Sequence, residues 1–377
     1  MDVNALNKTR LENDTRLADS LPAIASAIDR ESLSQFAKAY LGQYLNIDSS
    51  VAPAERVRLL ASEALANAVF EGFAASLQWD EMASPADIGE AATAENDLQE
   101  DVIILAALDY LGDTSISDLL DLDESVLQTG LCFHFAHITA HRHEWVNVLL
   151  RTRPDIAMPA LSQFWQGMVG SGTDFLPGLH QFVSREKIEP MAAEIILPLI
   201  RSWGNCKDKV LRELLCTALA AADLDELMSV CADKLSGTPL EGNRRVYWLA
   251  TASCMNSMNY IDALVHYVDR SREKALRLLD YLTLAMPILA SRGVRIAPEV
   301  MGKFLLVIAA KFPPQGDLTA PLDDTSQKVL TLFEYLGEDV SEEAGQVLET
   351  LRTVRVMRIC DAVIDYTEAL QYKARKA

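Results

Sequence analysis

The chain has 377 residues with 54 acidic and 34 basic side chains, which gives a formal net charge of −20. A surface of that sign repels phosphate backbones and anionic lipid headgroups, so the charge argues against nucleic acid and membrane surfaces as direct partners. Half of the residues are hydrophobic and no low-complexity tract occurs, which predicts a folded chain with a continuous core.

The negative charge is concentrated in one segment. Residues 59–141 contain 16 Asp or Glu and no Lys or Arg, whereas the rest of the chain has 38 acids against 34 bases. Such a segment attracts basic protein surfaces. Acids on exposed helix faces also serve simply to keep a chain in solution, and the sequence leaves both interpretations open.

Targeting signals and cysteine spacing indicate the compartment in which the chain resides. The first residues have neither the basic region nor the apolar run of a secretory signal, and no apolar run approaches the roughly 20 residues needed to span a bilayer. These features predict a cytoplasmic chain without a membrane span. The six cysteines are widely spaced within apolar helical patterns, which predicts buried thiols and neither disulfides nor a zinc site.

Apolar residues recur at helical spacing along almost the whole chain, and strand signals are nearly absent. After Pro53, which is tolerated in a first helical turn, a helix is expected to include Val57 to Ala68. Further helices are predicted over residues 98–111, 124–138, 144–150, 155–168, 189–203, 207–222, 224–235, 243–255, 261–284, 298–311, 326–336, 341–351 and 354–373.

Successive helices of about 12 to 20 residues joined by short loops are typical of arrays in which each helix pair packs only against its neighbours. The predicted fold is therefore all-α, an irregular α-solenoid of antiparallel helix pairs like those of HEAT and TPR proteins. Residues 82–96 and the proline-rich residues 312–325 interrupt the helical pattern. We expect an acidic N-terminal helical region over 1–125, a central helical-repeat array over 126–312, and a linker with a separate C-terminal helical unit over 313–377.

Four of the six histidines fall within ten residues. On a continuous helix His134, His137 and His141 would share a sector of about 60°, while His143 would point away. Three imidazoles in one stripe suit zinc, but no remote Asp, Glu or His presents itself as a further ligand. Histidines at a helix border near a turn are the structural alternative, and no cofactor is expected.

Residues 167–173 imitate the glycine spacing of a phosphate loop, but the phosphate-binding lysine is missing and a helix precedes them where a strand is required. We expect them to form the flexible end of the preceding helix.

Two groups of charged residues are candidates for partner binding. Arg244 and Arg245 open a helix with Tyr247 and Trp248, where they suit a carboxylate or another anion, or else ion pairs with the adjacent helix pair. The acidic candidates fall within 22 residues that contain no cation: Asp80, Glu81, Asp87, Glu90, Glu95, Asp97, Glu100 and Asp101.

From about Glu144 to the end, the order of packing residues resembles the helical-repeat region of bacterial NACHT-type (STAND) NTPases of antiphage defence. The resemblance rests on Trp145 with Leu149-Leu150 and Arg153-Pro154-Asp155, on Phe175 to Leu179 and Phe182, on Ile196 to Ile200, on Arg244 to Ala250, on Val329 to Leu336 and on Ser341 to Leu351. It implies a sensor or scaffold that recognises a protein within a larger NTP-driven, antiviral switch. The Walker motifs and an effector are absent from the sequence given, so it does not imply ATP hydrolysis by this chain.

The leading hypothesis is a non-enzymatic helical-repeat sensor or scaffold that recognises a protein with a basic surface. The alternative is a metal-dependent enzyme that uses the stripe of His134, His137 and His141. A third hypothesis, an acidic nucleic-acid mimic or inhibitor, follows from charge alone, and the apolar run from Val102 to Ala107 argues against it because it is typical of a core.

Overall fold

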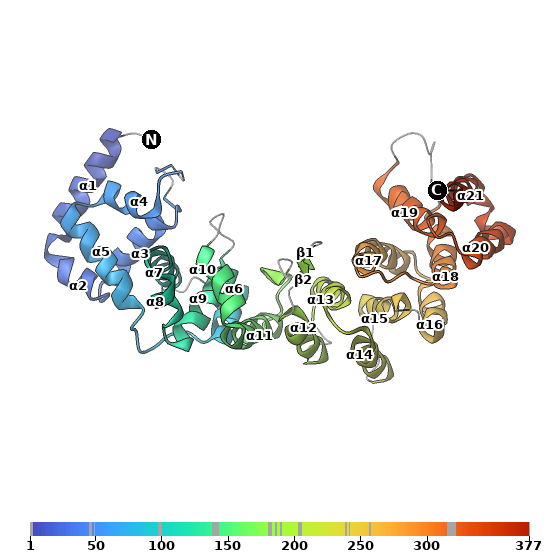
Figure 1. Ribbon diagram of the computed structural model, residues 1–377, viewed down its shortest axis with the longest axis horizontal. Helices are drawn as coiled ribbons and strands as arrows, with labels where there is room; N and C mark the ends of the chain where they lie inside the picture. Colours follow the sequence, from blue (N-terminus) through green and yellow to red (C-terminus); the bar gives the residue numbers. More distant parts are fainter. Residues whose placement is uncertain are drawn as a thin grey trace. The chain divides into compact units, whose positions relative to one another are not determined.

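The computed structural model describes residues 3–44, 47–48, 50–96, 100–137, 143–179, 183–184, 187–188, 191–202, 206–237, 240, 242–255, 258–314 and 322–376. It confirms an all-α fold (Figure 1). The only strands among these residues are the two-residue β1 (Val183–Ser184) and β2 (Lys187–Ile188), which pair antiparallel. No helix in the described ranges is long and apolar enough to cross a membrane.

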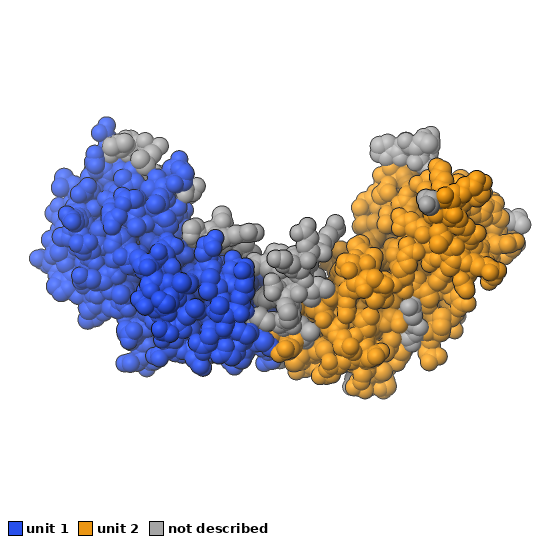
Figure 2. All heavy atoms as spheres, in the orientation of Figure 1, with its two compact units in different colours: residues 1–178 blue, residues 179–377 orange. Residues whose placement is uncertain are grey.

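Two compact units make up the chain, residues 1–178 and residues 179–377 (Figure 2). Unit 1 has 27 acidic residues against 10 Lys and Arg, a formal charge of −17, while unit 2 has 27 against 24, a formal charge of −3. The expected boundaries after residues 125 and 312 differ from this division. Residue 125 lies within a helix that packs on helices before it, and the helices after residue 313 pack on those before it, so contacts continue across both positions.

Unit 1 is built around one helix that is buried on every side over most of its length. Its helices are α1 (Val3–Leu17), the short 3-10 helix η1 (Ala18–Ser20), α2 (Leu21–Ala25), α3 (Arg30–Tyr40), α4 (Pro53–Leu60), α5 (Glu63–Ser76), α6 (Pro85–Thr93), α7 (Asp101–Thr114), α8 (Ile116–Leu120), α9 (Glu124–Ala136), α10 (Glu144–Thr152) and α11 (Pro154–Gly170). Every residue of α7 from Asp101 to Asp109 is buried, and α3, α5, α8, α9 and α10 pack against this helix. A helix with so little polar surface is stable only as the centre of a unit.

Unit 2 stacks its helices in two layers. They are α12 (Met191–Ser202), α13 (Asp208–Ala221), α14 (Leu224–Ser236), α15 (Gly242–Cys254), α16 (Met258–Val268), α17 (Arg272–Ser291), α18 (Pro298–Ala309), α19 (Asp324–Gly337), α20 (Glu342–Thr353), the 3-10 helix η3 (Arg355–Cys360) and α21 (Asp361–Lys376). Contacts link α13, α15, α17, α19 and α21 in one layer, and α16, α18 and α20 in the other. Stacked pairs of this kind bury their apolar faces against neighbours. The α-solenoid arrangement expected from the sequence stays a prediction.

Two predicted helices are each divided in the structure. The residues predicted as one helix over 261–284 form α16 and α17, because Ser271 has extended backbone and its hydroxyl accepts a hydrogen bond from the Lys274 N–H. Ser62 caps α5 in the same way and separates it from α4. A serine oxygen at such a position satisfies an N–H group that has no partner within the helix, and this favours a new helix over continuation of the old one.

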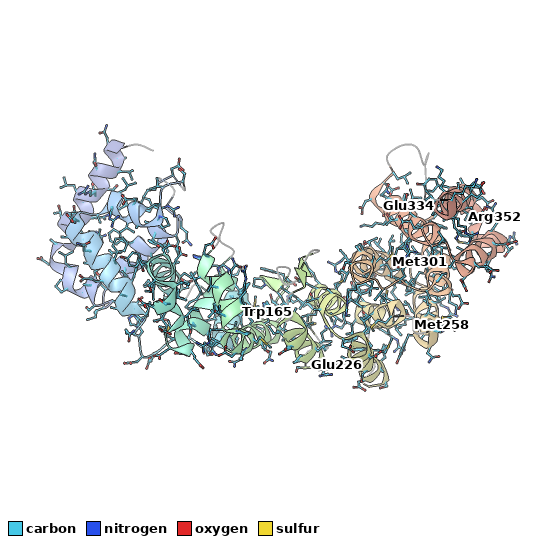
Figure 3. All side chains as sticks on the ribbon, viewed as in Figure 1. Trp165, Glu226, Met258, Met301, Glu334 and Arg352 are labelled. Carbon is cyan, nitrogen blue, oxygen red and sulfur yellow. The ribbon has the colours of Figure 1, made fainter. Side chains whose placement is uncertain are left out.

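The interruption expected at residues 82–96 is instead helical, since α6 occupies most of it. The second interruption is real: α18 ends at Ala309 and α19 begins at Asp324, although residues 315–321 lie outside the described residues. Beyond it, Arg352 of α20, labelled in Figure 3, binds Asp365 and Glu368 of α21 at 2.7 and 2.8 Å. These contacts fix the last helix on its neighbour.

Candidate functional site

Helix α6 presents a buried face to unit 1 and an acidic face to solvent. Pro85, Ile88 and Gly89 are buried, whereas Asp87 and Glu90 are exposed. Pro85 at the first helical position and the Ser84 oxygen, which accepts a hydrogen bond from the Asp87 N–H, start the helix here. Local capping chemistry and three small or apolar residues therefore determine which carboxylates face outward.

A close backbone contact fixes α6 on α11. A Cβ atom at Gly89 would lie 2.1 Å from the carbonyl oxygen of Phe164, and one at Gly167 would lie 2.3 Å from that of Ala86. Only glycine permits two helices to approach so closely at both positions. Gly167 is thus a packing residue within α11, which corrects the expectation that residues 167–173 form a flexible helix end; the turn follows at Gly172, where φ is +80°.

Two adjoining hollows lie beside α6. One of about 460 Å³ is lined by Asp87 and Glu90 together with Ala91, Thr93, Ala94, Asn96 and Ser171. The other, of about 190 Å³, shares Ala91 and Asn96 with it and adds Glu95 and His137. We call Asp87, Glu90 and Glu95, all exposed, the α6 acidic surface. It combines a negative rim with a floor of small residues, a surface that admits a long cationic side chain.

The other acidic candidates differ in exposure and in their contacts. Asp80 and Glu81 are exposed just before α6. Glu100 forms an ion pair with Arg30 of α3, whose guanidinium also stacks 4.2 Å above the Trp79 ring. Asp97 lies outside the described residues.

Asp101 is buried and paired, which corrects the expectation that it belongs to an exposed acidic surface. It is only 4% exposed, and one of its carboxylate oxygens lies 2.6 Å from Nε2 of His137. The physical reason is its place at the start of α7, where the helix is surrounded by packing partners.

A second pair of the same kind lies two turns further along α7. Asp109 Oδ1 lies 2.9 Å from Nδ1 of His143, and both side chains are buried. The two acids are eight residues apart, so they leave the helix about 80° apart around its axis. Asp101 therefore binds His137, just before residues 138–142, and Asp109 binds His143, just after them. The carboxylate of Asp109, after burial itself, also contributes to a raised pKa of Tyr40.

The predicted histidine stripe does not form on a helix. Helix α9 ends at Ala136 and His137 has extended backbone angles, so His134 and His137 do not continue one helical face. His141 lies outside the described residues. In the part of the chain that the structure describes, no group of three or more His, Cys, Asp or Glu side chains is placed to hold a metal ion. The two histidine–aspartate pairs instead join α7 to the ends of α9 and α10.

Both arginines at the start of α15 contact side chains of other helices in unit 2. Arg244 lies 3.5 Å from Asp208 of α13, and the Arg245 guanidinium lies 5.4 Å from the centre of the Tyr267 ring. Both are half-buried. Arg244 therefore follows the structural alternative, an ion pair with an adjacent helix, while Arg245 has a cation–π contact.

Cysteines behave as the sequence predicts. All six are free and buried. Burial raises the pKa of Cys216 and of Cys231 to about 12, so neither is a thiolate near neutral pH.

Sequence reasoning found the exposed acids but missed the two histidine–aspartate pairs. Asp101 and Asp109 bracket the apolar run from Val102 to Leu108, and polar residues at both ends of a buried run are the signal that could have revealed them. Comparison with protein-family models, with curated proteins and with solved structures found no match to this chain. The residues themselves therefore carry the functional argument.

Proposed function

We propose that unit 1 recognises a protein partner with a basic surface through the α6 acidic surface. The observation that carries the proposal is the exposure of Asp87 and Glu90 at a hollow of about 460 Å³ and of Glu95 at the adjoining hollow of about 190 Å³, within a segment that has no Lys or Arg. We further propose that this binding is non-enzymatic, with the chain serving as a sensor or scaffold.

Electrostatic attraction supports this role both before the partner makes contact and within the complex. The formal charge of −17 on unit 1 attracts a cationic protein over distances up to the screening length of about 8 Å at physiological ionic strength, and it raises the rate of encounter. At contact, Lys or Arg side chains of the partner would meet the three carboxylates, while their alkyl stems would cover Ala91 and Ala94.

The setting of this recognition is part of the proposal. The resemblance of residues 144–377 to the helical-repeat region of NACHT-type NTPases agrees with a sensor or scaffold role. On that basis we propose a cytoplasmic bacterial assembly of antiphage defence in which nucleotide chemistry belongs to another polypeptide or domain.

Binding of a short Lys-Gly repeat peptide, labelled with a fluorophore, tests the proposal. The triple variant Asp87→Lys, Glu90→Lys and Glu95→Lys should bind it at least about tenfold more weakly, because each exposed ion pair contributes about 0.2–1 kcal/mol and reversal adds repulsion. The matched control reverses three exposed acids of unit 2, Glu342, Glu343 and Glu349, with the same change of charge. Equal loss in both triple variants would show that only net charge matters and would refute the proposal.

A further inference from the structure

The smaller hollow beside α6 has the size and the walls of a pocket for one side chain. It has a volume of about 190 Å³ and lies where α9 packs on both α6 and α7. Ile88, Phe133 and three alanines form its apolar wall, and none of the described residues that line it is Lys or Arg. Pockets for small molecules typically begin at about 300 Å³, so this smaller one suits a single long side chain. We call it the Glu95 pocket.

Two helices end at the Glu95 pocket. Ala91 and Ala92, which line it, belong to the last turn of α6. Ala136, which also lines it, is the last residue of α9. The carbonyl end of a helix carries the negative end of its dipole and favours a cation. The start of α7 brings the opposite end of a dipole to the pocket, but its first residue, Asp101, places a carboxylate there.

Two carboxylates line the pocket, and they differ in their partners. Asp101 is held by His137, whose Nε2 lies 2.6 Å from one of the carboxylate oxygens. Glu95 is exposed, and no Lys, Arg or His nitrogen of the described residues lies within 4.0 Å of its carboxylate. A cationic group that enters the pocket therefore meets a carboxylate that is not already neutralised by the chain itself.

The backbone at Glu95 adopts a conformation that favours glycine. Its φ is +54°, its N–H donates to the Ala92 carbonyl oxygen at 3.4 Å, and the Asn96 N–H donates to that of Ala91 at 3.0 Å. These are the hydrogen bonds that usually close a helix at a glycine. A residue with a Cβ atom is strained there, so the chain carries a carboxylate at this position at a cost in stability.

We propose that the Glu95 pocket takes one arginine side chain of the basic partner. The inference rests on the proposed function and adds to it the identity of one partner residue. The alkyl stem of the arginine lies against the apolar wall, while its guanidinium pairs with Glu95 and donates to the side-chain oxygen of Asn96. Arginine fits better than lysine, because a guanidinium matches both oxygens of a carboxylate at once and is more weakly hydrated than an ammonium group.

Two fluorescent peptides of equal charge test the pocket: a Lys-Gly repeat, and the same peptide with its central lysine replaced by arginine. The arginine peptide should bind the full chain about fivefold more tightly, the factor that one additional hydrogen bond typically gives. Glu95→Gly should abolish this preference. It should also raise the melting temperature of unit 1 by about 2–4 °C, because glycine relieves the backbone strain. A preference lost from a more stable protein is not a result of unfolding.

Ala27→Gly is the matched control. Ala27 is a second residue of unit 1 with positive φ, +55°, and it lines neither hollow beside α6. This variant changes backbone strain of the same kind and should keep the fivefold preference. Ala92→Leu, which fills the Glu95 pocket without a change of charge, should abolish it.

The outcomes separate this inference from the proposed function. Equal affinity of the two peptides for the unmodified chain overturns the arginine pocket and leaves the proposed function standing. A preference that survives Glu95→Gly or Ala92→Leu also overturns the pocket. Failure of both peptides to bind refutes the proposed function itself, and the pocket with it.

Discussion

Replacement of Gly167 by alanine tests how α6 is held in place. The new Cβ would lie 2.3 Å from the Ala86 carbonyl oxygen, whereas ordinary contact begins at 3.4 Å, so the two helices would have to separate by about 1 Å. The opposing atom belongs to the backbone of α6 and cannot move away by a change of rotamer. The strain therefore falls on the helix that carries the α6 acidic surface.

The expected magnitude follows from two opposing effects. Gly→Ala in the interior of a helix stabilises it by about 1 kcal/mol. Overpacking a tight contact costs about 1–3 kcal/mol, and a contact against backbone belongs at the upper end of that range. We expect Gly167→Ala to lower the free energy of unfolding of unit 1 by about 2 kcal/mol.

Gly345→Ala in α20 is the control. Its Cβ would meet only the ends of two long side chains, Arg375 at 3.2 Å and Gln371 at 3.6 Å, and no backbone atom, so a shift of a few tenths of an ångström by Arg375 accommodates it. This variant should gain up to about 1 kcal/mol from helix propensity. Hydrogen exchange followed by mass spectrometry reports the opening free energy of each unit separately. If the amide hydrogens of α6 and α11 exchange as slowly in Gly167→Ala as in the unmodified chain, the close crossing of these helices is not what holds α6.

Three further results are expected. Asp109→Ala should lower the free energy of unfolding by about 1–3 kcal/mol, because Nδ1 of the buried His143 loses the Asp109 carboxylate as its hydrogen-bond partner; an unchanged urea midpoint would contradict this. Hydrogen bonds from Ser326 lower the pKa of Asp323 below 3.8, so the cap of α19 contributes fully above that value and is lost as the pH falls through the lower, folded value. The melting temperatures of Asp323→Asn and the unmodified chain should therefore converge only in this acidic range, and convergence already at about pH 5 would be inconsistent with the cap. Burial raises the pKa of Cys206 and of Cys360 to about 11. A thiol reagent at about pH 8 should therefore label all six cysteines in urea before it labels any in the folded chain. Early labelling of a cysteine in the folded chain would count against burial.

Helical periodicity predicted most elements of unit 2 well because their ends carry local signals. Helices α13, α14 and α18 lie within two residues of the predicted ranges. The prediction failed where a single residue divides an apolar pattern, as Ser271 does between α16 and α17. It also failed at α6, whose buried residues are only Pro85, Ile88 and Gly89, so the helix depends on close backbone contact with α11 more than on a long hydrophobic stripe.

The candidate sites show the same limit. The exposure of Asp87 and Glu90 could be anticipated because acids surround them in the sequence, whereas the buried Asp101 has its partner, His137, 36 residues away. Contacts across such distances in the chain leave no local pattern.

Chemical cross-linking tests most directly whether the α6 acidic surface is the site of recognition. A carbodiimide joins carboxylates to the amines of a bound Lys-Gly repeat peptide without a spacer, and mass spectrometry identifies the linked residues. Cross-links should be concentrated on Asp87, Glu90 and Glu95 and should fade as salt is added. Cross-links spread evenly over exposed acids, including Glu342 and Glu343 of unit 2, would contradict the account.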